Sequence, residues 1–168
     1  AGTHQAVVGD VNGDGEADLI VTAPHISRID NCWNGAAYVQ AGPVAAGTHS
    51  LGDAYARLVA VGACSGVDGV APLGDLDGDG GGDFLLGSTE GSETQGAAFL
   101  FHSPVAAGTT YTTDADTSWV QEASGDGAPV LPRAVGDVDG DGTTDLVIGA
   151  GCEDTNGAYA GAAYVIYG

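Results

Sequence analysis

Positive charge is almost absent from this chain. It contains no lysine and only three arginines against 23 acidic residues, so its net charge is −20 over 168 residues. Such a chain cannot neutralise phosphate groups by releasing counterions, which makes nucleic acid and anionic membrane surfaces poor partners. The sequence also lacks an apolar run long enough to cross a bilayer, so we predict no membrane insertion.

Catalytic groupings are missing as well. His4, His25, His49 and His102 share no metal-binding spacing, and no Ser/His/Asp or Cys/His arrangement is suggested by the sequence. We therefore interpret the histidines as surface or turn residues and predict a non-catalytic protein.

Glycine, by contrast, is abundant. The chain has 30 glycines, yet 43% of its residues are hydrophobic, which excludes a disordered low-complexity chain. Glycines that separate many short, β-prone runs are typical of an all-β fold.

Aspartate gathers in three stretches with one pattern. Residues 10–18, 75–83 and 137–145 each place oxygen-bearing side chains at positions 1, 3, 5 and 9 of a nine-residue loop, with glycine at positions 4 and 6. The glycines permit sharp turns that aim the side chains at one point, and Ca²⁺ takes about 6–8 oxygen ligands. A solvated acidic turn is the alternative, which three matched copies disfavour. With position 7 contributing a backbone carbonyl, the predicted ligands of three calcium ions are Asp10, Asn12, Asp14, Glu16 and Asp18; Asp75, Asp77, Asp79, Gly81 and Asp83; and Asp137, Asp139, Asp141, Thr143 and Asp145.

Each loop is followed by apolar, β-prone residues. An EF-hand would need an acidic residue at position 12, where this chain has Val21, Leu86 and Ile148. A D-x-D/N-x-D-G-x-x-D loop that opens into a hydrophobic strand resembles the FG-GAP repeat of integrin α-chain β-propellers, and the later Gly-Ala-Ala-aromatic strands resemble the family's Gly-x-Val-Tyr-Val strand. The Phe-Gly pair that names the family is not evident upstream of the loops. The resemblance implies calcium-binding propeller blades and a ligand-binding face away from the calcium loops.

Two markers repeat along the chain with one period. The loops start 65 and then 62 residues apart, and the Gly-Ala-Ala segments are spaced by 61 and 65 residues. We predict three blades at 1–63, 64–125 and 126–168, built from eleven strands, with the third blade lacking its outer strand. This would be an arc or half of a larger propeller. Tyr38, Phe99 and Tyr164 share one repeat position and are predicted to be blade core.

The connections opposite the acidic loops are the predicted recognition surface. The segment Pro24–Asn34 is expected to be a long connection, in which Arg28 and Trp33 are the predicted ligand-binding residues. Cys32 and Cys64 are expected on one face of one blade and could form a disulfide. Cys152 would then be free or paired outside the chain.

These features predict a calcium-stabilised propeller module, secreted or on the cell surface, that binds protein or glycan ligands in adhesion. The alternatives are an accessory propeller of a secreted enzyme and a carbohydrate-binding lectin propeller. Because propellers close with about 4–8 blades, we expect either a homodimer that closes six blades or the remainder of a longer parent chain.

Overall fold

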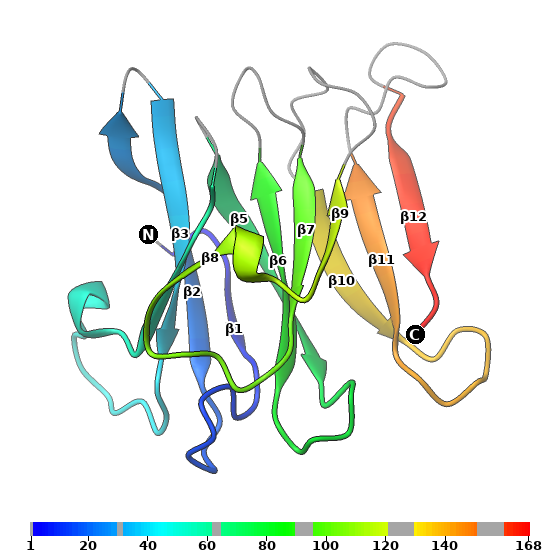
Figure 1. The fold of residues 1–168 in the computed structure, drawn as a ribbon, viewed down its shortest axis with the longest axis horizontal. Helices are drawn as coiled ribbons and strands as arrows, with labels where there is room; N and C mark the ends of the chain where they lie inside the picture. The colour runs from blue at the N-terminus through cyan, green and yellow to red at the C-terminus, as the bar shows by residue number, and fades with distance from the viewer. Residues whose placement is uncertain (1, 30–31, 62–64, 90–95, 121–129, 151–159) are drawn as a thin grey trace.

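The computed structural model describes residues 2–29, 32–61, 65–89, 96–120, 130–150 and 160–168. Apart from two short 3₁₀ helices, η1 (Leu51–Asp53) and η2 (Thr112–Asp114), its regular structure consists of β-strands. These strands form three sheets that stand side by side in chain order (Figure 1). The all-β prediction is confirmed.

The strands of each sheet follow one another as in a propeller blade. The first sheet has the order β1 (Gln5–Val7), β2 (Leu19–Ile29), β3 (Cys32–Gln40), β4 (Ala56–Val59) and β8 (Gly108–Tyr111). The second contains β5 (Gly66–Gly74), β6 (Asp83–Thr89), β7 (Ala97–Phe101) and β9 (Thr117–Val120). The third contains β10 (Val130–Gly136), β11 (Asp145–Ala150) and β12 (Ala162–Ile166). All consecutive pairs are antiparallel except β4 and β8.

The first strands of the three sheets approach one another. Residues of β1, β5 and β10 line one cavity of about 440 Å³, with Gln5, Val70 and Arg133 among them. First strands that converge on a common space are typical of propeller blades, whose first strands lie nearest the axis. Within the described residues, the three propeller-like sheets form an arc and do not close a ring (Figure 1).

Packing explains why the middle sheet has the most apolar strand. In β6, Phe84, Leu85 and Leu86 are all fully buried. Phe84 and Leu86 belong to the core against the first sheet, and Leu85 belongs to the core against the third. A strand covered on both faces needs no polar alternation, so β6 reads as a continuous hydrophobic run.

The third sheet shows the opposite pattern. Leu146 and Ile148 of β11 are buried against the second sheet. The predicted core residue Tyr164 is instead 45% exposed, and Val165 is 50% exposed. The core prediction is wrong for Tyr164, whereas its counterpart Phe99 packs partly buried against the first core.

Two strand predictions need correction. The expected long connection at Pro24–Asn34 is largely strand, because β2 continues to Ile29 and β3 begins at Cys32, with irregular register between Ala23 and Ser27. The described residues contain twelve strands, and the one not predicted is β8. It lies in the connection between β7 and β9 but pairs in parallel with β4 of the first sheet. The pairing with β4 supplies partners that the local sequence does not reveal.

Candidate metal centres

The three acidic loops occupy equivalent places in the three sheets. They connect β1 to β2, β5 to β6 and β10 to β11, and they lie along one edge of the molecule, at the bottom of Figure 1. Each loop is therefore the turn between the first two strands of its blade, which pair with each other and hold both ends of the loop.

Position 1 of each loop organises the turn around its own carboxylate. One oxygen of this aspartate accepts a hydrogen bond from the N–H of position 4, and the other accepts from the N–H of position 6. The distances are 2.7 and 2.7 Å for Asp10, 2.7 and 3.0 Å for Asp75, and 2.6 and 2.9 Å for Asp137. Positions 4 and 6 have φ between 82° and 96° in all three loops, a conformation that favours glycine.

Positions 3 and 5 repeat the same local bonding two residues further on. The side-chain oxygen of position 3 accepts from the N–H of position 5 at 2.9–3.1 Å. That of position 5 accepts from the N–H of position 7 at 2.7–2.9 Å. Backbone donors thus hold one oxygen of each side chain in place before any ion is considered.

Position 9 joins the loop to the third strand of its blade. Asp18, Asp83 and Asp145 are each fully buried. One oxygen of each accepts from the N–H of loop position 2, at 2.6–3.0 Å. The other accepts from a backbone N–H just beyond the third strand, which belongs to Gly42 (2.8 Å), Ser103 (3.0 Å) or Gly168 (3.0 Å). The position 9 aspartate is therefore a structural clamp as well as a predicted ligand.

Hydrogen bonds and burial act in opposite directions on these carboxyl groups. The hydrogen bond from the Gly15 N–H is the largest effect that lowers the pKa of Asp10 below its ordinary value. The bond from the Val138 N–H likewise lowers the pKa of Asp145. Burial raises the pKa of Asp18, and the repulsion of its acidic neighbours adds to that effect.

The first loop differs from the others at position 3. Asn12 Oδ1 accepts from the Asp14 N–H at 2.9 Å, so its Nδ2 must face the cluster, where it donates to Asp14 Oδ2 at 3.0 Å and to Asp18 Oδ1 at 3.3 Å. A flipped amide would set Nδ2 against the Asp14 N–H, two donors facing each other. The first loop therefore presents a donor where the other loops present a second carboxylate oxygen.

The donor atoms of the second and third loops fit a divalent cation. Side-chain oxygens lie within 4.8 Å of one another in the groups Asp75, Asp77 and Asp79, and Asp137, Asp139 and Asp145. Carboxylates at such distances repel one another, and a hard cation with oxygen ligands relieves that repulsion. Carboxylate oxygens grouped in this way suit a hard divalent cation such as Ca²⁺.

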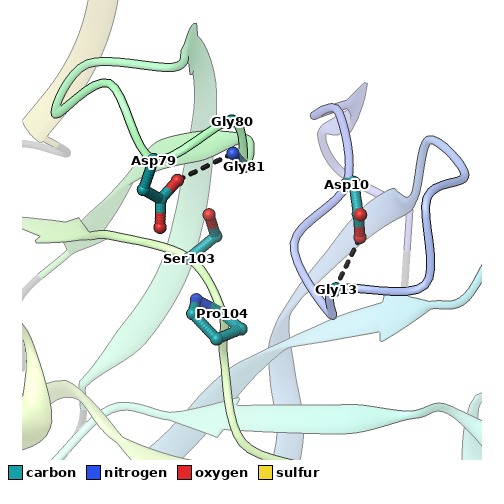
Figure 2. Close-up of a pocket in the computed structure, with 7 residues that line it drawn as sticks. All are labelled: Asp10, Gly13, Asp79, Gly80, Gly81, Ser103 and Pro104. Carbon is teal, nitrogen blue, oxygen red and sulfur yellow. Dashed lines mark hydrogen bonds between the residues drawn. The ribbon is translucent and has the colours of Figure 1, made fainter.

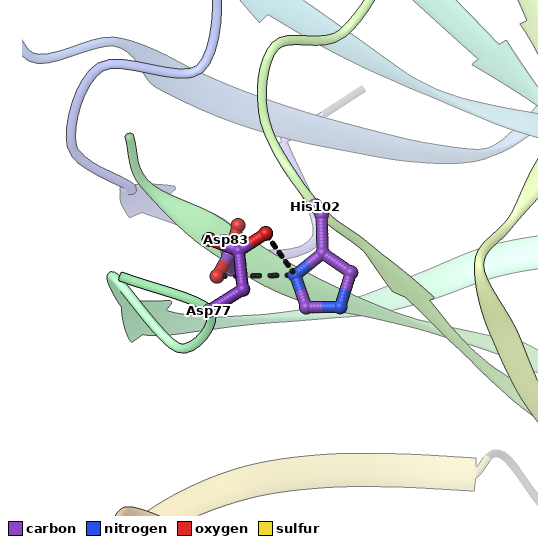
Figure 3. A group of neighbouring side chains, drawn as sticks. All are labelled: Asp77, Asp83 and His102. Carbon is purple, nitrogen blue, oxygen red and sulfur yellow. Dashed lines mark ion pairs between the residues drawn. The ribbon is translucent and has the colours of Figure 1, made fainter. Parts of the chain in front are cut away.

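A histidine that the sequence analysis left aside belongs to the second loop. His102 follows β7, and its Nδ1 lies 3.2 Å from Asp83 Oδ2 and 3.7 Å from Asp77 Oδ2 (Figure 3). The three residues form a third group of candidate metal-binding atoms. Sequence spacing gave no signal for it, because His102 is distant from the loop in the chain.

The first two loops are coupled directly. The Gly82 N–H donates to the Asp10 carbonyl at 2.7 Å, and the Val105 N–H donates to the Val11 carbonyl at 2.8 Å. Between these loops lies an open cavity of about 280 Å³, which Asp10, Gly13, Asp79, Gly80, Gly81, Ser103 and Pro104 line (Figure 2). Adjacent blades thus share backbone contacts at their acidic loops.

The remaining predicted site residues are the proposed ligand-binding pair and the cysteines. The backbone pairs Arg28 with Trp33 across the β2–β3 hairpin. Cys32 begins β3, but Cys64 lies outside the described residues, as does Cys152, so the disulfide stays a prediction.

The architecture and the loops define a class: a propeller-like repeat protein with a row of acidic candidate cation loops. Residues 3–39 and 134–166 match the family model described as FG-GAP repeat. The chain is 29% identical to integrin alpha-5 of Xenopus laevis and 31% identical to integrin alpha-PS2 of Drosophila melanogaster, in each case over 90% of its length. The predicted resemblance is confirmed: the chain carries FG-GAP repeat matches and is similar to integrin alpha chains over most of its length.

The chain spans 15% and 11% of the lengths of these two relatives. No helix among the described residues is both long and apolar enough to cross a membrane.

Proposed function

We propose that this chain is a calcium-stabilised β-propeller module for extracellular binding or adhesion, and that it is not an enzyme. The observation that carries the proposal is the repeated bonding of the acidic loops, in which backbone N–H groups fix the side-chain oxygens of positions 1, 3, 5 and 9 in every copy. A preorganised set of oxygens loses little freedom when an ion binds, so the loops are suited to a structural cation.

Three calcium ions are the proposed cofactors, one in each loop. Position 7 supplies a backbone carbonyl from Glu16, Gly81 or Thr143, and side chains at positions 1, 3, 5 and 9 supply the remaining protein oxygens. In the first loop, Asn12 would have to turn its Oδ1 toward the ion, because its Nδ2 now faces the cluster. The bound ion would remove the repulsion among the carboxylates and stiffen the turn between the first two strands of each blade. Calcium at extracellular concentrations suits exposed acidic loops, which supports a secreted or cell-surface location.

Calorimetric titration of the chelator-treated chain with Ca²⁺ tests this assignment. We expect three ions per chain and a higher melting temperature in calcium, since a ligand that binds only the folded state stabilises it by RT ln(1 + [Ca²⁺]/Kd) at each site. An unchanged melting temperature with no bound metal by elemental analysis would contradict the calcium proposal.

The proposed recognition surface is the β2–β3 hairpin, at the opposite end of the blade from the acidic loop. Arg28 and Trp33 are paired positions on its two strands. A cation and an aromatic ring are both common in the energetic centres of interfaces, which supports these two positions as ligand-binding residues. The proposed ligand is a protein or a glycan.

Binding of the calcium-loaded chain to a glycan array and to immobilised extracellular-matrix proteins identifies the ligand class. The double variant Arg28→Ala/Trp33→Ala should lose binding to whichever surface retains the wild type, while its melting temperature stays nearly unchanged. Arg133→Ala is the matched control, because it removes an exposed arginine from β10, far along the chain from the hairpin. Equal binding by the double variant would move the site away from the hairpin.

We further propose that additional blades complete the ring, from a second copy of the chain or from a longer parent protein. In the second repeat, β8 adds to the outer strand of the preceding sheet. The corresponding residues of the first repeat, 47–50, are exposed and are not in a strand. A neighbouring blade would give them the partner that β8 has in β4. Light scattering of the calcium-loaded chain should show self-association, and a stable monomer would contradict closure by a second copy.

A further inference from the structure

The third strand of the second blade ends differently from those of its neighbours. The N–H groups of Gly42, Ser103 and Gly168 make the same hydrogen bond to the position 9 carboxylate, which fixes the alignment of the three repeats at this point. The residue before each is Ala41, His102 or Tyr167. Among these three residues, only His102 of the second repeat has a side-chain nitrogen that could bind a metal ion beside the acidic loop.

The space for the second polar residue, Ser103, is provided by the loop itself. A Cβ on Gly81, at position 7, would lie 1.6 Å from Ser103 Oγ. In the third repeat the arrangement is reversed, because Thr143 occupies position 7 and a Cβ on Gly168 would lie 2.6 Å from the Thr143 Cγ2. The second blade thus has glycine on the loop and a serine side chain after β7, whereas the third blade has a threonine side chain on the loop and glycine after β12.

Two buried polar atoms at this place lack hydrogen-bond partners. Ser103 is 8% exposed, and its Oγ has no partner, although it points toward Asp79 and Gly81 (Figure 2). His102 Nδ1 is likewise buried without a hydrogen bond. It lies at ion-pair distance from Asp83 Oδ2 (3.2 Å) and Asp77 Oδ2 (3.7 Å), but neither contact has the geometry of a hydrogen bond. A buried polar atom without a hydrogen bond costs free energy, and a bound group at the site would offset that cost.

The side chains of His102, Asp77 and Asp83 point toward one another (Figure 3). One Nδ1 and two carboxylate oxygens, from His102, Asp77 and Asp83, all lie within 4.8 Å of one another. Neutral imidazole is a good ligand for Zn²⁺ and related transition metals, whereas Ca²⁺ prefers oxygen. A site with one nitrogen and two carboxylates therefore differs in metal preference from a site made of oxygen alone.

We propose that the second loop is a mixed nitrogen–oxygen site that binds a divalent transition-metal ion of the Zn²⁺ class through His102, Asp77 and Asp83. The first and third loops, which have Ala41 and Tyr167 instead, lack an imidazole and remain calcium sites. A water molecule on the bound ion would give Ser103 Oγ the partner that it lacks. This inference rests on the proposed function, in which the acidic loops are metal sites.

Titration with Zn²⁺ in excess Ca²⁺ tests the proposal directly. The wild-type chain should bind one Zn²⁺ under these conditions. His102→Ala and His102→Tyr place at this position the residues that the other two repeats carry, so both variants should fold. Each should weaken Zn²⁺ binding by at least about tenfold, the smallest loss typical of changes around a metal site. All three chains contain the same cysteines and other histidines, so the difference isolates His102.

A spectroscopic measurement separates direct coordination from an indirect effect. Pulsed electron paramagnetic resonance of the chain loaded with one Cu²⁺ in excess Ca²⁺ should show coupling to the imidazole nitrogen of His102, which both variants should lose, because Cu²⁺ shares the preference of Zn²⁺ for imidazole. Equal Zn²⁺ affinity in wild type and variants, or an absent nitrogen coupling in wild type, would overturn the proposal. If the nitrogen coupling is absent in wild type, His102 pairs with the carboxylates of Asp77 and Asp83 and does not bind the metal.

The calcium stoichiometry keeps this inference distinct from the proposed function. Two calcium ions should remain in the wild-type chain when Zn²⁺ is bound, and they should be unaffected by the His102 variants. A chain that binds Ca²⁺ in all three loops and shows no preference for Zn²⁺ refutes the mixed site alone. A chain that binds no Ca²⁺ in the first and third loops refutes the calcium proposal.

Discussion

The buried aspartate at loop position 9 has two roles that can be separated by experiment. Asp83 accepts hydrogen bonds from the Leu76 N–H at 2.7 Å and from the Ser103 N–H at 3.0 Å, so it ties the loop to the end of β7. Asp79, at position 5, is exposed and, among the described residues, accepts a hydrogen bond only within the loop, from the Gly81 N–H. Both are predicted metal ligands, but only Asp83 connects different elements.

Asp83→Ala should therefore destabilise the fold even without calcium. A hydrogen bond to a charged group contributes about 1.5–3 kcal/mol, so two such bonds give roughly 3–6 kcal/mol. Removing a buried charge recovers part of its desolvation cost, and we expect a net loss near the lower value, about 3 kcal/mol. With a urea dependence of about 1–3 kcal/mol/M, the midpoint should fall by roughly 1–3 M. Asp83→Asn keeps one acceptor and should lie between alanine and wild type.

Urea denaturation in chelator and in excess calcium measures both effects. In chelator, Asp79→Ala should unfold within about 0.5 kcal/mol of wild type, as expected for an exposed side chain. In calcium, both variants should lose the stabilisation that comes from the ion in the second loop. If Asp83→Ala and Asp79→Ala have the same midpoint in chelator, the carboxylate of Asp83 is not a structural clamp and this argument is wrong.

Three further outcomes are expected. Asp141→Ala should leave two bound metal ions out of three and lower the melting temperature in calcium but much less in chelator, which elemental analysis and calorimetry can check. On acidification, calcium should leave the first loop before the third, because Asp18 has a raised pKa and protonates at higher pH than Asp145, whose pKa is lowered. Nuclear magnetic resonance of the loop amides in calcium would show the order, and simultaneous release would contradict it. Gly81→Ala should destabilise the chain through a clash with Ser103, and Ser103→Gly should restore its melting temperature in the double variant. No rescue would show that the exchange of side chains between the loop and β7 is not compensatory.

The acidic loops could be predicted from sequence because their chemistry is local. Each carboxylate bonds to N–H groups a few residues away, and glycine at positions 4 and 6 has the positive φ that the turn needs. The apolar strand after each loop was predicted for the same reason. Its burial against a neighbouring sheet is encoded in consecutive residues such as Phe84–Leu86.

The unpredicted strand β8 shows where local reasoning ends. The segments 43–48 and 104–109 have the same sequence, Pro-Val-Ala-Ala-Gly-Thr. In the second repeat this segment leads into β8, because β4 lies beside it and supplies parallel pairing. In the first repeat the same residues lead into an exposed segment that is not a strand. Identical sequences therefore differ in structure because their partners lie in different blades.

His102 was missed for a related reason, and its recovery shows what a repeat offers that a motif does not. A motif search looks for ligands at fixed spacing, but His102 reaches the second loop only because the Ser103 N–H bonds to Asp83 and places the end of β7 beside the loop. That bond is the same in every blade, so it aligns the residues of the three repeats that lie beside their acidic loops.

A residue that all three repeats share, such as the aspartate at position 9, indicates what the fold requires. A position where one copy departs from the other two, as His102 does, is free of that requirement. Such a departure points to binding, because Ala41 and Tyr167 at the same place in the other repeats show that the fold does not require an imidazole beside the acidic loop.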